Sequence, residues 1–128
     1  MNEITDYGKV FDILVAKTKE YLISNNLKAI ILGISGGIDS TVCAAICHEV
    51  SKQTGIPLIG RSLPTKFNKE GETSTAYLVG KAFCDDFEVY SMGDIYEEVE
   101  NSFSRYESKS PTPISSGNIQ ARLRMIYL

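Results

Sequence analysis

The chain has 128 residues, of which 43% are hydrophobic, and a net charge of −3, which suits one globular domain with its own core. This charge argues against bulk electrostatic binding to nucleic acid, and no apolar run approaches the roughly 20 residues of a membrane span. Three cysteines without the spacing of a disulfide framework, and a start at residues 1–6 without the pattern of a secretory leader, predict a cytoplasmic protein.

The chain begins with a predicted helix over residues 8–26. Apolar residues recur along it at helical spacing, and charged residues lie mostly on the other side. The residues of the apolar stripe are Phe11, Leu14, Val15, Thr18, Tyr21 and Leu22. We expect this stripe to cover a sheet, and we assign the helix no chemistry.

The most informative stretch follows directly. An apolar run at residues 29–34 predicts a buried strand, and residues 41–50 predict a helix. Between them lies Ser35-Gly36-Gly37-Ile38-Asp39-Ser40. Glycines allow close approach of the backbone, and the free N–H groups and dipole of a helix N-terminus attract negative charge, so this turn predicts an anion site. The alternative is a sharp turn whose Ser35 or Ser40 only caps the helix.

The loop differs from the better-known phosphate loops. It lacks the Gly-Lys-Ser/Thr ending of a Walker A loop and the G-x-G-x-x-G of a dinucleotide fingerprint. Ser-Gly-Gly-x-Asp-Ser instead resembles the pyrophosphate-binding loop of the ATP pyrophosphatase group, which includes NAD, GMP and asparagine synthetases. The resemblance implies that the loop holds the β- and γ-phosphates of ATP while a substrate is attached to AMP.

The predicted helix after the loop carries Cys43, Cys47 and the only histidine, His48. A zinc site needs about four convergent ligands, and His48 points roughly 100° away from Cys47 on a helix. We therefore interpret both cysteines as small buried apolar residues. A single histidine also leaves no second one for a Ser/His/Asp or Cys/His catalytic set.

The remaining elements alternate between strands and helices. Strands are predicted at 56–63 and 86–92, helices at 74–83 and 94–106, and a mobile surface loop at 107–117. Strand–helix repeats of about 30 residues predict parallel strands with right-handed crossovers. The fold class is therefore α/β: a three-layer, Rossmann-like parallel sheet with helices on both faces. Asp85 and Asp86 are interpreted as a solvated turn. Residues 61–65 should lie beside the loop at residues 35–40, which we call the phosphate loop.

The second informative stretch is residues 117–125. Asn118 predicts a helix cap, and by composition alone the segment is a cationic helix start. Asn-x-x-Ala-Arg-x-Arg-Met, about 80 residues after the phosphate loop, resembles the second signature of NAD synthetases. Together with the intervening Leu-Pro segment, the resemblance covers roughly residues 10–128, and it implies the adenine nucleotide alpha hydrolase-like form of this fold.

The resemblance implies site residues position by position. ATP would be bound by Gly33, Ile34, Ser35, Gly36, Gly37, Ile38, Asp39, Ser40 and Ser62. Ser35, Asp39 and Ser40 would act in catalysis, and Asp39 would bind Mg²⁺, a hard cation that takes carboxylate and phosphate oxygens. Asn118 and Arg122 would bind deamido-NAD. The adenine contact is open, because the family carries arginine at the position of Ser62 and here Arg61 is displaced by one residue, which turns a strand side chain to the other face.

The resemblance also implies a reaction. The carboxylate of deamido-NAD attacks ATP, releasing pyrophosphate, and ammonia then displaces AMP to give NAD, in a homodimer. Alternatives are another adenylating enzyme of the loop group, such as a GMP synthetase, or a non-catalytic ATP-binding fragment. Because NAD synthetases of this kind are longer, we expect residues 1–128 to be one synthetase-type domain, shortened at its C-terminus.

Overall fold

The computed structural model describes residue 3 and residues 5–128, so the prediction about the chain start at residues 1–6 lies partly outside it. The elements, in chain order, are α1 (Tyr7–Ser24), β1 (Ile30–Gly33), α2 (Ile38–Thr54), β2 (Leu58–Ser62), α3 (Glu70–Phe83), β3 (Asp86–Val89), α4 (Gly93–Glu107) and α5 (Pro113–Tyr127). Within the described residues, no helix is both long and apolar enough to cross a membrane.

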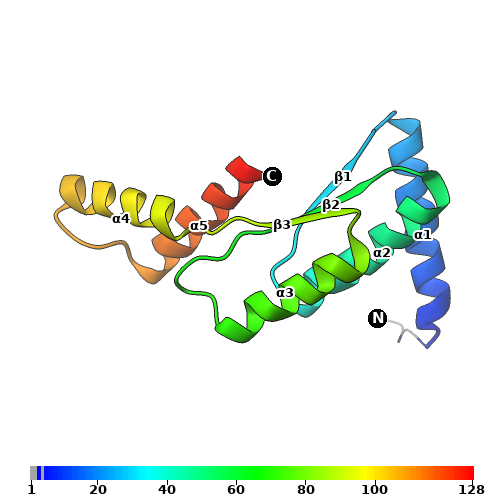
Figure 1. The fold of residues 1–128 in the computed structure, drawn as a ribbon, viewed down its shortest axis with the longest axis horizontal. Helices are drawn as coiled ribbons and strands as arrows, with labels where there is room; N and C mark the ends of the chain where they lie inside the picture. Colours follow the sequence, from blue (N-terminus) through cyan, green and yellow to red (C-terminus); the bar gives the residue numbers. More distant parts are fainter. Residues whose placement is uncertain (1–2, 4) are drawn as a thin grey trace.

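The three strands form one parallel sheet in the order β1-β2-β3 (Figure 1). Ile30 pairs with Leu58 at one end of β1, and Gly33 pairs with Arg61 at the other. The strands therefore end at the same edge, where the phosphate loop and the segment after β2 emerge together. The predicted α/β class with a parallel sheet and flanking helices is confirmed.

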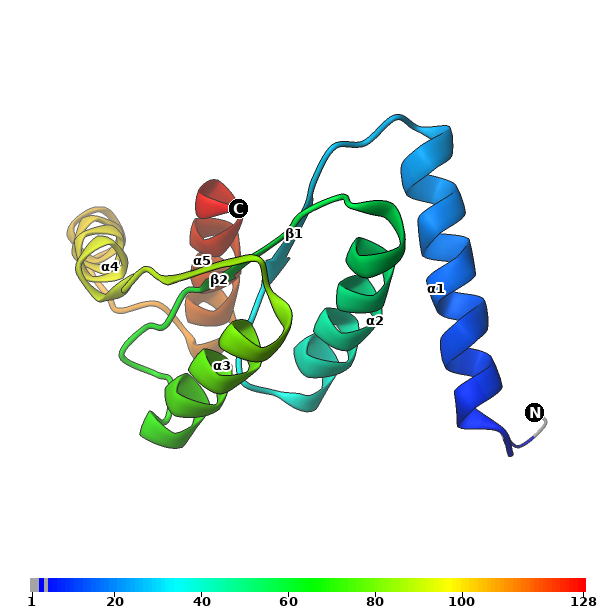
Figure 2. The ribbon, with the colours of Figure 1, turned by 45° about the vertical axis from the view of Figure 1, so that its right-hand side comes forward.

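The helices before β3 lie on one side of the sheet. α2 and α3 contact the strands, whereas α1 packs on the outer side of α2 (Figure 2). Val15 and Leu22 of α1 join Val50 of α2 in a buried cluster, and Leu14 and Tyr21 remain 45% and 63% exposed. The prediction that α1 covers the sheet is wrong for most of the helix, because α1 packs mainly on α2 and only Ile30, at the start of β1, packs against their shared cluster.

The core beneath the phosphate loop depends on one close approach. Ile34, Ala44, Ala76, Val79 and Phe87 form its buried cluster. A side chain at Gly80 would place its Cβ 2.2 Å from the Phe87 ring, so only glycine lets α3 lie this close to β3. The small residues of α2 and α3 thus bring both helices near the sheet, which sets the position of the loop between β1 and α2.

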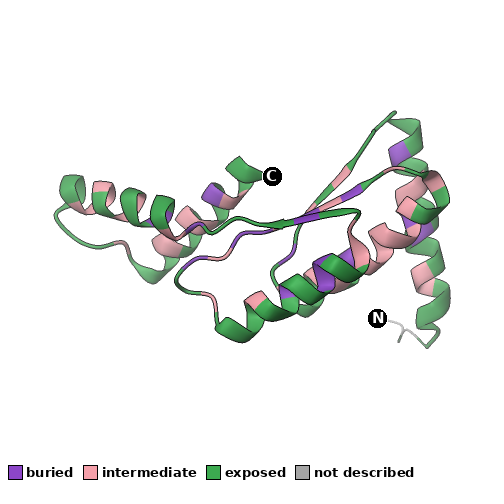
Figure 3. Ribbon diagram, viewed as in Figure 1, coloured by how far each residue is buried: buried purple, intermediate pink, exposed green. Residues whose placement is uncertain are grey.

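The other face of the sheet is more open. The last turn of α5 approaches it, with the Tyr127 ring 6.4 Å from that of Tyr90. Ile31 nevertheless remains 47% exposed, and the burial along β1 alternates (Figure 3). The prediction of a buried first strand is therefore wrong for this face, since β1 is an edge strand and the described helices contact mainly its other side.

The C-terminal helix begins earlier than the sequence suggests. Thr112 caps α5, its side chain accepting from the Ser115 backbone N–H at 3.2 Å, and Pro113 occupies the first turn. Residues 113–117 are therefore helical, which corrects the predicted loop at 107–117. Asn118 lies in the second turn and is not the cap. Thr-Pro-x-Ser is itself a helix start, because proline suits the first helical position.

Several polar side chains have structural roles that differ from their predictions. Cys43 is exposed, which corrects the prediction that it is buried, while Cys47 is half-buried. His48 Nδ1 lies 3.0 Å from the carbonyl oxygen of Phe83. Asp85 is exposed at a bend before β3, as predicted, and its carboxylate also accepts from the Leu58 backbone N–H at 2.7 Å, which fastens the start of β2. In the part of the chain that the structure describes, no three His, Cys, Asp or Glu residues group as metal ligands.

Candidate functional site

The two serines of the phosphate loop bind each other and the loop backbone. Their hydroxyl oxygens are 3.1 Å apart, and the backbone N–H of Ser35 donates to Ser40 Oγ at 3.2 Å. The Gly37 N–H donates to Ser35 Oγ, and the Ser40 hydroxyl donates to the Gly37 carbonyl, both at 3.2 Å. Neither serine caps α2, whose N-cap is Gly37 without a side-chain bond. The capping interpretation is therefore not supported.

Gly36 fixes the path of the loop. Its φ is +90°, in the left-handed region that favours glycine, and an added Cβ would lie 2.2 Å from the Glu72 carbonyl oxygen. The first turns of α3 thus press against the loop at a point where only a hydrogen atom fits. The loop is consequently held between the end of β1 and α3.

The N-terminus of α2 faces outward from this loop. Without a capping side chain at Gly37, the first N–H groups of the helix have no partner inside it. Ile38 is 74% exposed and Asp39 is exposed, so the first turn of α2 lies at the surface of the molecule. Exposed N–H groups, the helix dipole and two hydroxyls suit an anion with several oxygens, such as a phosphate chain.

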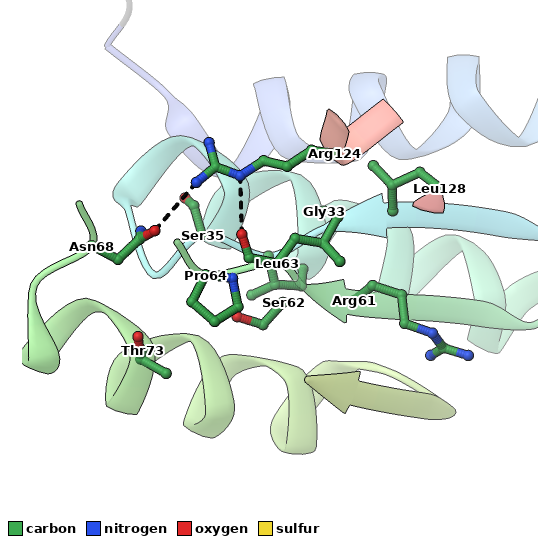
Figure 4. Close-up of a pocket in the computed structure, with 11 residues that line it drawn as sticks. Gly33, Ser35, Arg61, Ser62, Leu63, Pro64, Asn68, Thr73, Arg124 and Leu128 are labelled. Atoms are coloured by element: carbon green, nitrogen blue, oxygen red, sulfur yellow. Dashed lines mark hydrogen bonds between the residues drawn. The ribbon is translucent and has the colours of Figure 1, made fainter. Parts of the chain in front are cut away.

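A pocket of about 190 Å³ lies beside the loop (Figure 4). It is lined by Gly33, Ile34, Ser35, Arg61, Ser62, Leu63, Pro64, Asn68, Thr73, Arg124 and Leu128. The predicted proximity of residues 61–65 to the phosphate loop is confirmed. Ile34 is 1% exposed in the core, and its N–H donates to the Arg61 carbonyl at 2.8 Å, so it offers no free donor to a ligand.

The side chains of Arg61 and Ser62 face opposite sides of β2, as the alternation of side chains along a strand predicts. Ser62 is 3% exposed and lines the pocket. The Arg61 guanidinium turns away from the loop (Figure 4) and bonds Asp86 at 2.9 Å, with Tyr90 beneath it at 5.5 Å. The hydrogen bond to Asp86 raises the pKa of Arg61. Because the Arg61 guanidinium is engaged by Asp86, Ser62 is the one of these two residues whose side chain can interact with a ligand in the pocket.

Arg124 and Asn68 also belong to the site, and the sequence reasoning did not assign them to it. Arg124 Nε donates to the Leu63 carbonyl at 3.0 Å, and its Nη2 donates to Asn68 Oδ1 at 3.2 Å (Figure 4). The available signal was helical spacing, since Gln120, Arg124 and Leu128 are four residues apart and share one side of α5.

Asn118 and Arg122 lie elsewhere. Both are exposed, and neither lines the pocket. Arg122 is roughly 160° around the helix from Arg124, because each residue turns the helix by 100°. The structure thus brings together the predicted ATP residues but not the predicted deamido-NAD residues, whose role stays a prediction.

Comparisons with known proteins agree on one family. Residues 10–128 match the family described as NAD synthase. The chain is 33% identical to the NH(3)-dependent NAD(+) synthetase of Finegoldia magna, over 96% of this chain and 48% of the relative. It is 34% identical to the corresponding synthetase of Thermococcus sibiricus, over 96% of this chain and 45% of that one. The chain therefore spans about half the length of these curated relatives.

Solved structures support the same fold. The structure of NMN synthetase from Francisella tularensis matches with a TM-score of 0.82 and 26% identity, over 98% of this chain and 49% of that chain. A glutamine-dependent NAD+ synthetase from Acinetobacter baumannii, in complex with ADP, matches with a TM-score of 0.84 and 21% identity. That match covers 100% of this chain and 24% of the other, and because the identity is only 21% it supports a similar fold and nothing more.

Proposed function

This chain belongs to the NAD synthase family, and on that premise we propose that it acts in the ATP-dependent amidation of deamido-NAD to NAD. The observation that carries the proposal is the loop at residues 35–40. There, two mutually bonded serine hydroxyls and the uncapped N-terminus of α2 converge beside a pocket at the strand ends. Such an arrangement suits the phosphates of ATP.

The proposed reaction has two steps. An oxygen of the nicotinate carboxylate of deamido-NAD attacks the α-phosphorus of ATP, a new P–O bond forms, and pyrophosphate leaves. Ammonia then attacks the carbonyl carbon of the acyl adenylate, the C–O bond to AMP breaks, and the ammonia nitrogen gives up a proton. Adenylation is needed because a carboxylate oxygen is a poor leaving group, whereas AMP is a good one.

The phosphate loop has the charge-stabilising role in the first step. Negative charge builds on the β- and γ-phosphates as the bond to the α-phosphorus breaks. The free N–H groups at the start of α2 are donors that need little rearrangement, since Gly36 and α3 hold the loop. The hydroxyls of Ser35 and Ser40 would exchange their present bonds, within the loop, for bonds to the phosphate oxygens. Ser62 at the pocket wall is the proposed neighbour of the adenine.

Asp39 is the proposed magnesium ligand. Its exposed carboxylate stands in the first turn of α2, beside the proposed phosphate site, and Mg²⁺ commonly takes one or two carboxylates with substrate phosphates and water. The residue type and position therefore fit the ion. Bound there, Mg²⁺ would supply positive charge that offsets the charge of the phosphates.

The acceptor side of the proposal rests on α5. Asn118 and Arg122 are exposed polar side chains on one stripe of this helix, and in the proposal they bind deamido-NAD. Because they lie away from the pocket, the proposal includes a homodimer, in which an acceptor held by one subunit meets ATP held by its partner. Residues 1–128 form one synthetase-type domain in this proposal, and its proposed location is the cytoplasm.

One observation favours a second acceptor. The likeness to a structure named NMN synthetase, at 26% identity, makes a pyridine mononucleotide an alternative to the dinucleotide. The chemistry at the carboxylate would be the same. Membership of the NAD synthase family favours either pyridine nucleotide over xanthylate, the acceptor of a GMP synthetase.

The test is pyrophosphate release from Mg-ATP by the chain, with deamido-NAD, nicotinate mononucleotide or xanthylate as acceptor. Release that depends on deamido-NAD supports the proposal, and release that depends on the mononucleotide favours the second acceptor. Binding of ATP without release under any condition contradicts adenylation by this chain and favours the alternative of an ATP-binding module.

A pair of matched variants tests whether pyrophosphate release depends on the phosphate loop. Asp39→Asn removes the proposed magnesium ligand, and Asp94→Asn makes the same change in the first turn of α4. We expect Asp39→Asn to lower the rate by about a hundredfold, in the range found when a charge-stabilising group is removed, and Asp94→Asn to leave it unchanged. Equal rates for both variants would remove Asp39 from the mechanism.

A further inference from the structure

One side chain connects α5 with the wall of the ATP pocket. Arg124 is half-buried and reaches across to the segment at residues 63–69, which follows β2. Its Nε donates to the Leu63 carbonyl at 3.0 Å, and its Nη2 donates to Asn68 Oδ1 at 3.2 Å (Figure 4). A single planar group thus bonds Leu63 and Asn68, two residues that line the pocket on either side of the turn at residues 66–67.

Asn68 is the centre of a small network around this contact. Its Oδ1 also accepts from the Thr65 backbone N–H at 2.8 Å. The Thr65 hydroxyl donates to Gln120 Oε1 at 2.8 Å, one helical turn before Arg124 on α5. Thr65 is 8% exposed, so these bonds are sheltered from water. Two residues of α5 are therefore bonded to the segment that carries Leu63, Pro64 and Asn68 to the pocket, in addition to the local bonds of that segment.

We propose that Arg124 is a positioning residue for ATP: it holds the segment at residues 63–69 in the shape that completes the pocket, and it acts through Leu63 and Asn68. The inference rests on the proposed function, since it concerns the same ATP site. It assigns to α5 a second role on the face opposite Asn118 and Arg122. The helix proposed to bind the acceptor is thereby also the helix that shapes the ATP pocket.

The chemistry of the contact needs arginine. The guanidinium is a rigid fork whose donors reach two acceptors at once, whereas a lysine ammonium is one compact charge. Both acceptors are held by neighbouring bonds: the carbonyls on either side of Leu63, those of Ser62 and Pro64, accept from the Tyr90 and Met92 N–H groups at 2.8 Å, and Asn68 Oδ1 accepts from Thr65. Replacing Arg124 by lysine would keep the positive charge and one contact but not the bridge.

The test measures ATP affinity by titration calorimetry for four forms of the chain. We expect Arg124→Met to weaken ATP binding about tenfold, the size of one lost charge-assisted hydrogen bond, and Arg124→Lys to fall between it and the unchanged chain. Arg105→Met, at an exposed arginine of α4, is the matched control and should bind ATP normally. Wild-type affinity in Arg124→Met would overturn the inference.

A double-variant cycle separates positioning from direct contact with ATP. If Arg124 acts through Asn68, the double variant with Asn68→Ala loses less affinity than the product of the two single losses. If Arg124 instead touches ATP independently of Asn68, the losses multiply, which would also overturn the inference. Circular dichroism confirms that each variant is folded before it is compared.

Amide exchange gives a readout that needs no ATP. The Thr65 N–H is held by Asn68 Oδ1, so releasing Asn68 should speed its exchange about tenfold in Arg124→Met, while amides in the middle of α2 exchange as before. Unchanged exchange at Thr65 would overturn the inference. If the unchanged chain binds no ATP, the proposed function fails and the positioning role falls with it, whereas ATP binding that ignores Arg124 refutes the inference alone.

Discussion

The phosphate loop and the segment at residues 63–69 line the same pocket, but they are held in different ways. The loop is fixed by bonds between residues two to five positions apart, such as Ser35 to Ser40. The segment has local bonds of its own, such as that from the Thr65 N–H to Asn68, and it is also bonded to Gln120 and Arg124, 55 to 61 residues away in the chain. One wall of the site is thus held largely by local bonds, and the other is held in addition by bonds to a distant helix, α5.

The two walls of the pocket depend on packing in different parts of the fold. The loop also depends on α3, whose backbone touches Gly36, so its local bonds are reinforced by packing. The segment depends on the packing of α4 and α5, whose buried cluster is Leu63, Met92, Tyr96 and Leu123. Changes in the first region should damage the whole fold, and changes in the second should act mainly on one wall of the pocket.

The largest expected effect is that of Gly36→Ala. The φ of +90° and the 2.2 Å approach of the new Cβ to the Glu72 carbonyl oxygen both oppose the substitution. We expect the free energy of unfolding to fall by about 3 kcal/mol or more, from backbone strain and overpacking together. Urea denaturation measures it.

The matched control is Gly117→Ala in α5. Nothing lies within 4 Å of its added Cβ, and alanine is the better helix former, so this change should stabilise the chain by about 0.5–1 kcal/mol. If both glycine variants had the same stability, the close packing of α3 on the phosphate loop would be refuted.

The next effect is that of Leu123→Ala, which tests the second region. Leu123 is 8% exposed in the cluster that joins α4 and α5 to the end of β2. Its truncation should cost about 2–3 kcal/mol, and amide exchange should rise most in α5 and residues 63–69. Ile126→Ala on the same helix, at a residue 76% exposed, should change little. Equal exchange throughout the chain would show that the two walls are not independent.

A smaller effect is expected for Tyr96→Phe. The Tyr96 side chain is fully buried, and its hydroxyl oxygen is 2.5 Å from Ser116 Oγ, which links α4 to α5. Loss of this hydrogen bond should lower the free energy of unfolding by about 1 kcal/mol. Tyr106→Phe, at a tyrosine 84% exposed, is the control for the same chemical change. An unchanged urea midpoint for Tyr96→Phe would mean that the link contributes nothing.

The smallest perturbation is alkylation of the cysteines beneath the phosphate loop. Burial raises the pKa of the Cys47 and Cys84 thiols, so at pH 8 a smaller fraction of each is the reactive thiolate. Cys43 is exposed, and iodoacetamide should modify it first, as peptide mass spectrometry would show. As the pH is raised, the alkylation rates at Cys47 and Cys84 should still be increasing at pH values above the ordinary pKa of a thiol. Modification of Cys47 as fast as Cys43 would contradict the packing of α2 against α3.

Much of the fold and one wall of the site could be predicted from the sequence. The parallel sheet follows from alternating strand and helix patterns, and the loop from Ser-Gly-Gly-x-Asp-Ser, because these signals lie within a few neighbouring residues. Alternation along β2 also predicted that Arg61 and Ser62 would face opposite sides. The start of α5 does not follow from composition, since the Ser/Pro run before Gly117 is typical of a loop although Thr112 and Pro113 form a helix start.

By itself, the sequence determined most of the elements, the parallel direction of the strands and the position of the loop at residues 35–40, because periodicity and turn chemistry are local properties. The tertiary structure alone decided that α1 packs on α2 and that one face of β1 stays open. It also decided that Arg124, rather than Arg122, faces the pocket. These outcomes depend on which surfaces meet across 30 to 60 residues of chain, and hydrophobic spacing indicates that a face is buried without saying what buries it.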